Sequence, residues 1–138
     1  MNILVTGGSG FIGSRLVEEL LRDGHSVSIF DKAESHFFPS LVQLGDVRDL
    51  QSICRSLEGK DAVFHLAAEH RDDVTPLSLY DEVNIGGAEN LVKAADASGC
   101  KRIIFTSSVA VYPLNAGTPT EERDPQPFNR YGVSKLGA

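Results

Sequence analysis

The sequence has little of what marks secreted, membrane-spanning or disulfide-rich proteins. Its 138 residues include two cysteines, Cys54 and Cys100, and no CxxC pair. We therefore expect two buried thiols rather than a disulfide or half of a metal site. No run of about 18 apolar residues is present, which argues against a transmembrane helix. The N-terminus has no basic segment followed by an apolar one, so a secretory signal is not expected.

Positive charge is also scarce. The chain carries 13 Lys and Arg against 19 Asp and Glu, a net charge of −6. Nucleic acids and anionic membranes are bound through clustered cations, so neither is an expected partner. A bound anion should instead be held by backbone N–H groups and a helix N-terminus. The composition predicts a cytoplasmic globular protein of one domain, long enough to bury a core.

Short apolar runs alternate with helical patterns along the chain. The predicted strands cover residues 3–5, 27–30, 41–44, 62–66 and 102–106, and the predicted helices cover 11–22, 50–57 and 79–98, with a last helix beginning near Tyr131. This alternation is typical of βαβ crossovers and a buried parallel sheet. Right-handed crossovers favour a doubly wound α/β sheet with strand order 3-2-1-4-5. Ligands of such sheets bind beyond the carboxyl ends of the strands, where we look for the site.

A glycine cluster follows the first predicted strand. Residues 6–13 read TGGSGFIG and contain both the Gly8-x-Gly10-x-x-Gly13 and the Gly7-x-x-Gly10-x-x-Gly13 spacing. Glycines between a strand and a helix let the backbone approach a pyrophosphate, and the helix N-terminus supplies free N–H groups. The alternative is an ordinary tight turn. The position at the first strand–helix junction favours a phosphate cradle.

An acidic residue, Asp31, ends the second predicted strand, 18 residues after Gly13. A carboxylate there accepts hydrogen bonds from the ribose hydroxyls of adenosine and repels a 2′-phosphate. The neighbouring Lys32 weakens this charge argument, and a solvated strand-end Asp is the alternative. The predicted cofactor is NAD rather than NADP.

These motifs combine with residues 45–49 (GDVRD), 65–68 (HLAA) and 131–135 (YGVSK) into a recognisable set. Together they resemble the extended short-chain dehydrogenase/reductase family, and within it the NAD-dependent epimerase/dehydratase group that acts on nucleotide sugars. The resemblance implies that residues 1–138 form a Rossmann-type NAD-binding domain, the N-terminal part of a longer architecture. The sheet would then be incomplete at its C-terminal side, and the substrate domain would be absent from this chain. The resemblance also implies a homodimer for the full-length protein.

The resemblance further assigns roles to individual residues. Phe11 and Ile12 offer backbone N–H groups to the cofactor, and Asp46 and Val47 match a pair that contacts adenine. The residues expected to contact NAD are Gly7, Gly10, Phe11, Ile12, Gly13, Asp31, Asp46, Val47, Leu66, Ala67, Ala68, Ser107, Tyr131 and Lys135. Asn84 is expected to be structural and His65 a packed strand-end side chain. The remaining histidines have no metal-type spacing, so no metal site is predicted.

The catalytic prediction rests on Ser108, Tyr131 and Lys135. Tyr131 and Lys135 lie four residues apart and would share one helix face. A phenol has a pKa near 10, and a nearby ammonium and the positive nicotinamide favour its ionised form. Ser108 matches the catalytic hydroxyl of the family, which orients the reacting oxygen. A surface Tyr–Lys pair is the alternative.

The two residues after Ser108 bear on the reaction type. Nucleotide-sugar 4,6-dehydratases carry Asp-Glu there, whereas this chain has Val109 and Ala110, which cannot move protons. We therefore expect an NAD-dependent epimerase of a nucleotide sugar, most simply a 4-epimerase, and not a dehydratase. Two alternatives stay open, a dehydrogenase or reductase of a non-sugar substrate and an NAD-sensing regulator. The 138-residue chain alone is expected to be inactive.

Overall fold

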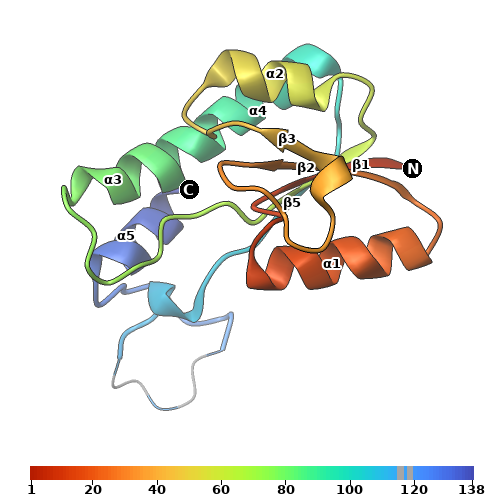
Figure 1. The fold of residues 1–138 in the computed structure, drawn as a ribbon. Helices are drawn as coiled ribbons and strands as arrows, with labels where there is room; N and C mark the ends of the chain where they lie inside the picture. The colour runs from red at the N-terminus through yellow and green to blue at the C-terminus, as the bar shows by residue number, and fades with distance from the viewer. Residues whose placement is uncertain (115–116, 118–119) are drawn as a thin grey trace.

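The strands form one parallel sheet with helices on both faces (Figure 1). The structure is a computed structural model that describes residues 1–114, 117 and 120–138. The strands are β1 (Asn2–Thr6), β2 (Ser26–Asp31), β3 (Val42–Leu44), β4 (Ala62–His65) and β5 (Ile103–Phe105), in the order β3-β2-β1-β4-β5. The predicted doubly wound sheet and its strand order are confirmed.

Three helices cover the sheet. Helix α1 (Phe11–Arg22) lies on one face, and α2 (Leu50–Leu57) and α4 (Gly87–Ser98) lie side by side on the other (Figure 1). The predicted helices over 11–22 and 50–57 are confirmed. The structure also contains helices α3 (Ser78–Tyr80) and α5 (Arg130–Gly137) and the 3₁₀ turns η1 (Pro39–Leu41) and η3 (Val109–Val111).

Strand β1 runs through the centre of the sheet and separates two apolar cores. Its side chains alternate, so that Ile3 and Val5 pack under α1 while Leu4 packs under α2 and α4. Leu4 and Val5 are fully buried. Burying an aliphatic side chain of this size contributes about 1.5–3 kcal/mol, so the central strand is a rigid base for the loops at its carboxyl end.

The predicted helix over 79–98 is interrupted in the structure. A π-helical turn, η2 (Asp81–Gly86), separates α3 from α4. Asn84 lies inside this turn, and its buried amide makes hydrogen bonds to two other segments. Tertiary bonds of this kind hold a wider helical turn, and an apolar pattern cannot distinguish it from a regular α-helix.

Two further sequence expectations concern cysteines and membrane segments. Cys54 and Cys100 are both free thiols; Cys100 is buried and Cys54 is half-buried. The burial expected for the two thiols is therefore complete for Cys100 and partial for Cys54. Among the described residues, no helix has the length and apolar character needed to cross a membrane.

Candidate active site

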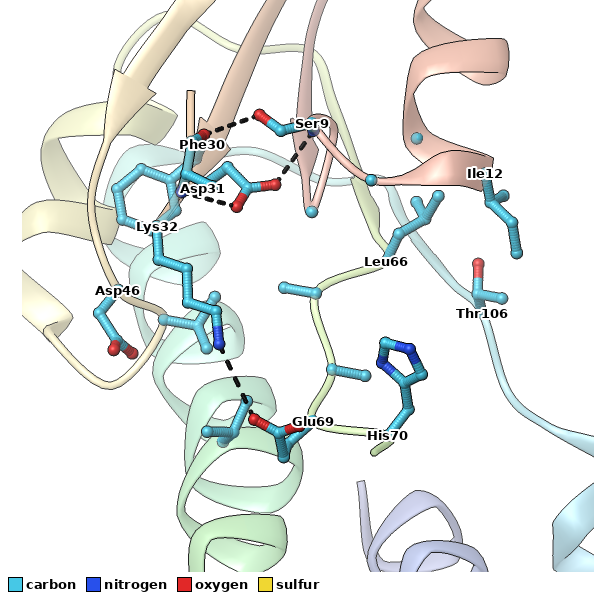
Figure 2. Close-up of a pocket in the computed structure, with 18 of the residues that line it drawn as sticks. Ser9, Ile12, Phe30, Asp31, Lys32, Asp46, Leu66, Glu69, His70 and Thr106 are labelled. Atoms are coloured by element: carbon cyan, nitrogen blue, oxygen red, sulfur yellow. Dashed lines mark hydrogen bonds and ion pairs between the residues drawn. The ribbon is translucent and has the colours of Figure 1, made fainter. Parts of the chain in front are cut away.

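A cleft of about 860 Å³ lies at the carboxyl ends of the strands, and Figure 2 shows part of its lining. Segments that follow β1, β2, β3, β4 and β5 contribute to it, together with α5. Every residue assigned to the site from the sequence lines this one cleft: Gly7, Gly10, Phe11, Ile12, Gly13, Asp31, Asp46, Val47, Leu66, Ala67, Ala68, Ser107, Ser108, Tyr131 and Lys135.

The turn after β1 depends on glycine at two positions. Gly7 has φ +72°, and a Cβ there would lie 2.6 Å from the backbone nitrogen of Ala67. A Cβ on Gly13 would overlap the carbonyl oxygen of Gly7. Side chains at these positions would therefore push α1 and the loop after β4 away from the turn. Their absence leaves a narrow backbone cradle of the kind that a dinucleotide pyrophosphate requires.

Helix α1 points its N-terminus into this cradle. Gly10 is the N-cap residue and offers no side-chain hydrogen bond to the first turn. The N–H groups of Phe11 and Ile12 have no acceptor within the helix. Their side chains are exposed (82% and 61%), so the first turn is open to a ligand. Free N–H groups and the helix dipole together favour a phosphate group here.

The carboxylate of Asp31 is held in place by two backbone N–H groups. Its Oδ2 accepts from Ser9 at 3.0 Å, and its Oδ1 accepts from Ala33 at 3.1 Å (Figure 2). An ionised carboxylate has about four acceptor positions, so capacity remains for hydroxyl donors. The geometry fits the predicted ribose contact.

Asp46 has a partner that the sequence analysis did not anticipate. Its Oδ2 lies 2.7 Å from Nη2 of Arg48, and its Oδ1 accepts from the backbone and Nε of Arg48. The Arg48 hydrogen bond holds the pKa of Asp46 below its usual value. Val47, between them, is buried against Gly87. The Asp46 carboxylate is thus charged and held in a fixed position where it lines the cleft.

Ser108 begins the η3 turn after β5. Its Oγ accepts a hydrogen bond from the backbone N–H of Ala110 at 3.1 Å, which fixes the oxygen and leaves the hydroxyl proton free to be donated. Ser107, the residue before it, is exposed at the cleft. Ser108 can therefore donate a hydrogen bond to an oxygen of a substrate bound in the cleft.

Helix α5 is docked closely against η3. The side chain of Asn129 caps the helix by accepting from the N–H of Gly132 at 2.7 Å. A Cβ on Gly132 would overlap the carbonyl oxygen of Ala110. Neither residue was expected from the sequence to have a role, although an Asn just before a helix is a recognisable cap signal. Together they bring Tyr131 and Lys135 into the same cleft as Ser108.

Lys135 is a buried cation. It is 4% exposed, and its Nζ lies 4.1 Å from the centre of the Phe105 ring. No carboxylate in the described part of the chain forms an ion pair with it. Burial lowers its pKa from 10.5 to about 8. A buried ammonium with few partners suits a site where a negative or hydroxyl-bearing ligand completes its surroundings.

Asn84 connects the loop after β4 to α5. Its Oδ1 accepts from the N–H of Glu69 at 2.8 Å, and its Nδ2 donates to the carbonyl of Glu69 at 3.0 Å and to Oγ of Ser134 at 2.8 Å. Asn84 is 2% exposed. These contacts agree with the structural role expected for this residue.

His65 ends β4 beneath the site. Its Nδ1 lies 2.7 Å from Oγ1 of Thr6, and burial lowers its pKa from 6.5 to about 4. The imidazole is therefore neutral near pH 7. The expected packed side chain is confirmed, and the contact with Thr6 ties β4 to β1 where both strands end.

One charged group at the cleft was missed altogether. Glu69 is 3% exposed, and its carboxylate lies 3.0 Å from Nε of Arg71 and 3.8 Å from Nζ of Lys32. Figure 2 shows Lys32 reaching from the end of β2 towards Glu69. Glu69 directly follows Ala68, so its position after a strand was the only signal available in the sequence.

Comparison with known proteins assigns this site to a family. The NAD dependent epimerase/dehydratase family matches residues 3–138. An Escherichia coli O157:H7 N-acetyl-alpha-D-glucosaminyl-diphospho-ditrans,octacis-undecaprenol 4-epimerase is 52% identical over 99% of this chain and 41% of its own length. A Lacticaseibacillus casei UDP-glucose 4-epimerase is 36% identical over 99% of this chain and 44% of its own.

A solved structure gives the same result. A short-chain dehydrogenase/reductase superfamily protein from Agrobacterium tumefaciens with bound NAD superposes with a TM-score of 0.91 at 33% identity, over 99% of this chain and 42% of that one. The chain spans less than half the length of these relatives. The matched profile, the relatives and the glycine cradle agree, and the chain belongs to the NAD-dependent epimerase/dehydratase family.

Proposed function

We propose that the protein is an NAD-dependent 4-epimerase of a sugar carried on a diphosphate, with nucleotide sugars as the substrate class. The observation that carries the proposal is one cleft lined by both the glycine cradle and the set Ser108, Tyr131 and Lys135. The names of the two relatives support the reaction, because both are 4-epimerases of diphosphate-linked sugars. The two names differ in the group that carries the sugar diphosphate, which is undecaprenol in the first and uridine in the second.

The residues of the cleft fit a dinucleotide. The backbone around Gly7 and Gly13 leaves room for a pyrophosphate, and the first turn of α1 offers N–H groups to it. Asp31 would accept the ribose hydroxyls, while Asp46 and Val47 would border the adenine. When bound, NAD supplies a hydride acceptor and donor for the carbon at position 4 of the sugar.

The protein's own groups would handle the proton. Tyr131 would take the proton of the 4-hydroxyl and return it after the sugar has presented its other face. The buried, poorly solvated ammonium of Lys135 would stabilise the tyrosinate. Ser108, fixed by Ala110, would donate a hydrogen bond to the reacting oxygen. Such acid–base catalysis contributes about 10²–10⁴-fold in rate.

The residues after Ser108 favour epimerisation over dehydration. Val109 is 73% exposed and Ala110 is buried in the η3 turn, and neither carries a titratable group. Removal of water from the sugar needs a proton donor and an acceptor beside the reacting carbons. These two positions offer neither, whereas epimerisation needs only Tyr131 and its supporting groups.

The test uses the complete protein with three substrates: UDP-glucose, UDP-N-acetylglucosamine and a short-chain polyprenyl-diphospho-N-acetylglucosamine. Proton NMR distinguishes the two configurations at carbon 4, and absorbance at the NADH band follows net oxidation. We expect interconversion of at least one substrate without accumulation of NADH. Stoichiometric NADH would identify a dehydrogenase instead, and NAD binding without turnover of any of the three would favour a regulator.

The variant Tyr131→Phe is the control for this test. It removes the phenolic oxygen and leaves the cradle around Gly7 and Gly13 intact, so we expect NAD affinity within about twofold of the parent. Turnover should fall by about 10²–10⁴-fold. A variant that kept most of its activity would contradict the role of Tyr131 as acid and base.

A further inference from the structure

Lys32 occupies a position where a cation would change cofactor preference. It directly follows Asp31, at the end of β2, and lines the cleft. Its side chain is 70% exposed and could turn towards a phosphate on the adenosine ribose. From the sequence alone, a lysine beside the ribose-binding carboxylate therefore weakens the preference for NAD that Asp31 indicates.

In the structure, this ammonium is directed elsewhere. Nζ of Lys32 lies 3.8 Å from Oε2 of Glu69, on the loop after β4 (Figure 2). The two residues are 37 positions apart in the chain, and they meet because β2 and β4 flank β1. Asp31 and Asp46 line the same cleft, where Asp46 is paired with Arg48 and Glu69 also contacts Arg71.

We propose that Glu69 is a specificity-determining residue for the cofactor: it holds and neutralises Lys32, so that the adenosine end of the cleft repels the 2′-phosphate of NADP and accepts NAD. This inference rests on the NAD site of the proposed function and assigns to that site a residue outside the set Ser108, Tyr131 and Lys135. Discrimination between NAD and NADP depends on both Asp31 and Glu69. Asp31 repels the 2′-phosphate, and Glu69 neutralises the Lys32 charge that would otherwise attract it.

The surroundings of Glu69 suit this task. The backbone of Glu69 is fixed on both sides by Asn84, at 2.8 and 3.0 Å, and its side chain is 3% exposed. Arg71 donates to Oε1, and this hydrogen bond holds the pKa of Glu69 below its usual value. Glu69 is therefore a fixed anion at neutral pH, whereas Lys32 is the exposed partner of the pair.

The experiment is a double-mutant cycle on the complete protein, with Glu69→Gln, Lys32→Ala and both changes together. The readout is the Kd of NAD and of NADP, measured by titration calorimetry in low-salt buffer. Glu69→Gln should tighten NADP binding by about three- to fivefold, the size of an exposed ion pair, and leave NAD within about twofold. Lys32→Ala in the Glu69→Gln background should remove the gain, and 0.5 M NaCl, chosen to shorten the Debye length to about 4 Å, should reduce it.

Arg71→Gln is the matched control, because it removes the other cation on the same carboxylate. Glu69 then keeps its charge and Lys32, so NADP binding should not tighten. The proposal is overturned if Glu69→Gln leaves the NADP affinity unchanged, or if its gain persists without Lys32. Failure of the parent protein to bind NAD would instead refute the proposed NAD site.

A single substitution tests the idea even if Glu69→Gln fails to fold. Lys32→Ala in the native background should change NADP affinity by less than about twofold, because the ammonium is already neutralised by Glu69. A threefold or larger loss of NADP affinity in this exposed-site variant would show that Lys32 already serves the phosphate. That result would also overturn the proposal.

Discussion

At the scale of single residues, the candidate site contains a buried charged group, Lys135, whose burial lowers the free energy of unfolding. Lys135 is buried without a carboxylate partner among the described residues, and its pKa is lowered by the loss of solvent. A charge in such surroundings opposes folding until a ligand or a neighbouring oxygen compensates it. His65, which is buried nearby, avoids this cost by staying neutral.

The first prediction concerns Lys135. Lys135→Met should stabilise the cofactor-free protein by about 1–3 kcal/mol at pH 7, because a thioether is not penalised by burial. The folded-state pKa of about 8 is below the unfolded value of 10.5, so the cost is complete below pH 8 and fades as the pH rises to 10.5. Thermal unfolding at pH 7 and pH 10 measures both effects, while turnover should be lost.

A lower melting temperature for Lys135→Met at pH 7 would contradict this prediction. Lys135→Arg serves as the control, because it keeps the charge and should not stabilise the protein. Both variants should show reduced turnover, which separates the effect on folding from the effect on the tyrosine.

The second prediction concerns His65 and acid. Its pKa is about 4 in the folded protein and 6.5 when unfolded, so the unfolded chain binds the proton first as the pH falls. Stability should therefore decrease between pH 6.5 and pH 4, with a contribution from His65 of about 3 kcal/mol. Urea unfolding at pH 7, 5.5 and 4.5 gives the slope.

His65→Gln isolates this contribution, because glutamine can still bond Thr6 but does not titrate in this range. The slope of stability against pH should be shallower for the variant than for the parent. Equal slopes would show that other groups dominate the acid sensitivity.

At the scale of elements, the turn between β1 and α1 has no room for a side chain at Gly7 or Gly13. The helix begins one residue after Gly10, and Gly13 in its first turn contacts the carbonyl of Gly7. The same close approach that allows phosphate binding also sets the angle of α1 on the sheet. A substitution at this turn should therefore change both phosphate binding and the packing of α1 on the sheet.

The third prediction follows from that contact. Gly13→Ala should destabilise the protein by about 1–3 kcal/mol through overpacking against Gly7. NAD affinity should fall by at least about tenfold, because a shift of α1 moves the N–H groups away from the phosphate. Calorimetric titration measures the NAD affinity, and urea unfolding measures the change in the free energy of unfolding.

Gly86→Ala is the matched control, since Gly86 has helical geometry and a Cβ there would lie 3.8 Å from the carbonyl oxygen of Asp81, an ordinary van der Waals distance. It should keep NAD affinity and change stability by less than about 1 kcal/mol. Unchanged NAD binding in Gly13→Ala would show that the cradle is more adaptable than the structure indicates.

At the scale of the whole molecule, apolar surface remains exposed beside β5. In the described sheet β5 pairs only with β4, and its Ile103 and Ile104 are 40% and 41% exposed. On α5, Val133 and Leu136 are 42% and 47% exposed. A strand edge and an apolar helix face of this kind invite association with another surface.

The fourth prediction concerns residues 1–138 produced alone. We expect weak NAD binding, no measurable epimerisation and a tendency to associate, because orientation of the substrate can supply about 7–11 kcal/mol of the barrier reduction and needs contacts from both sides. Light scattering, calorimetry and the NMR assay measure these properties. A monodisperse monomer with robust turnover would contradict this prediction, while homodimerisation of the complete protein stays a separate prediction.

Local patterns were sufficient to predict the sheet and much of the cleft lining. The alternation of apolar runs with helical segments gave the parallel sheet and its order, since crossover handedness leaves few topologies. The turn at Gly7 and the carboxylate of Asp31 were found because each follows a strand, and the ends of parallel strands meet at one edge. The pair Tyr131 and Lys135 was found from its helical spacing and from the family resemblance.

Tertiary structure alone decided the contacts between those motifs. The bonds of Asn84 to Ser134, the ion pair of Lys32 with Glu69 and the burial of Lys135 each depend on segments far apart in the chain. A residue's sequence neighbours determine its helix or strand and its face, because those depend on local periodicity. Its charge partner and its solvation depend on which loops the closed sheet brings together, and that information exists only once the strands have paired.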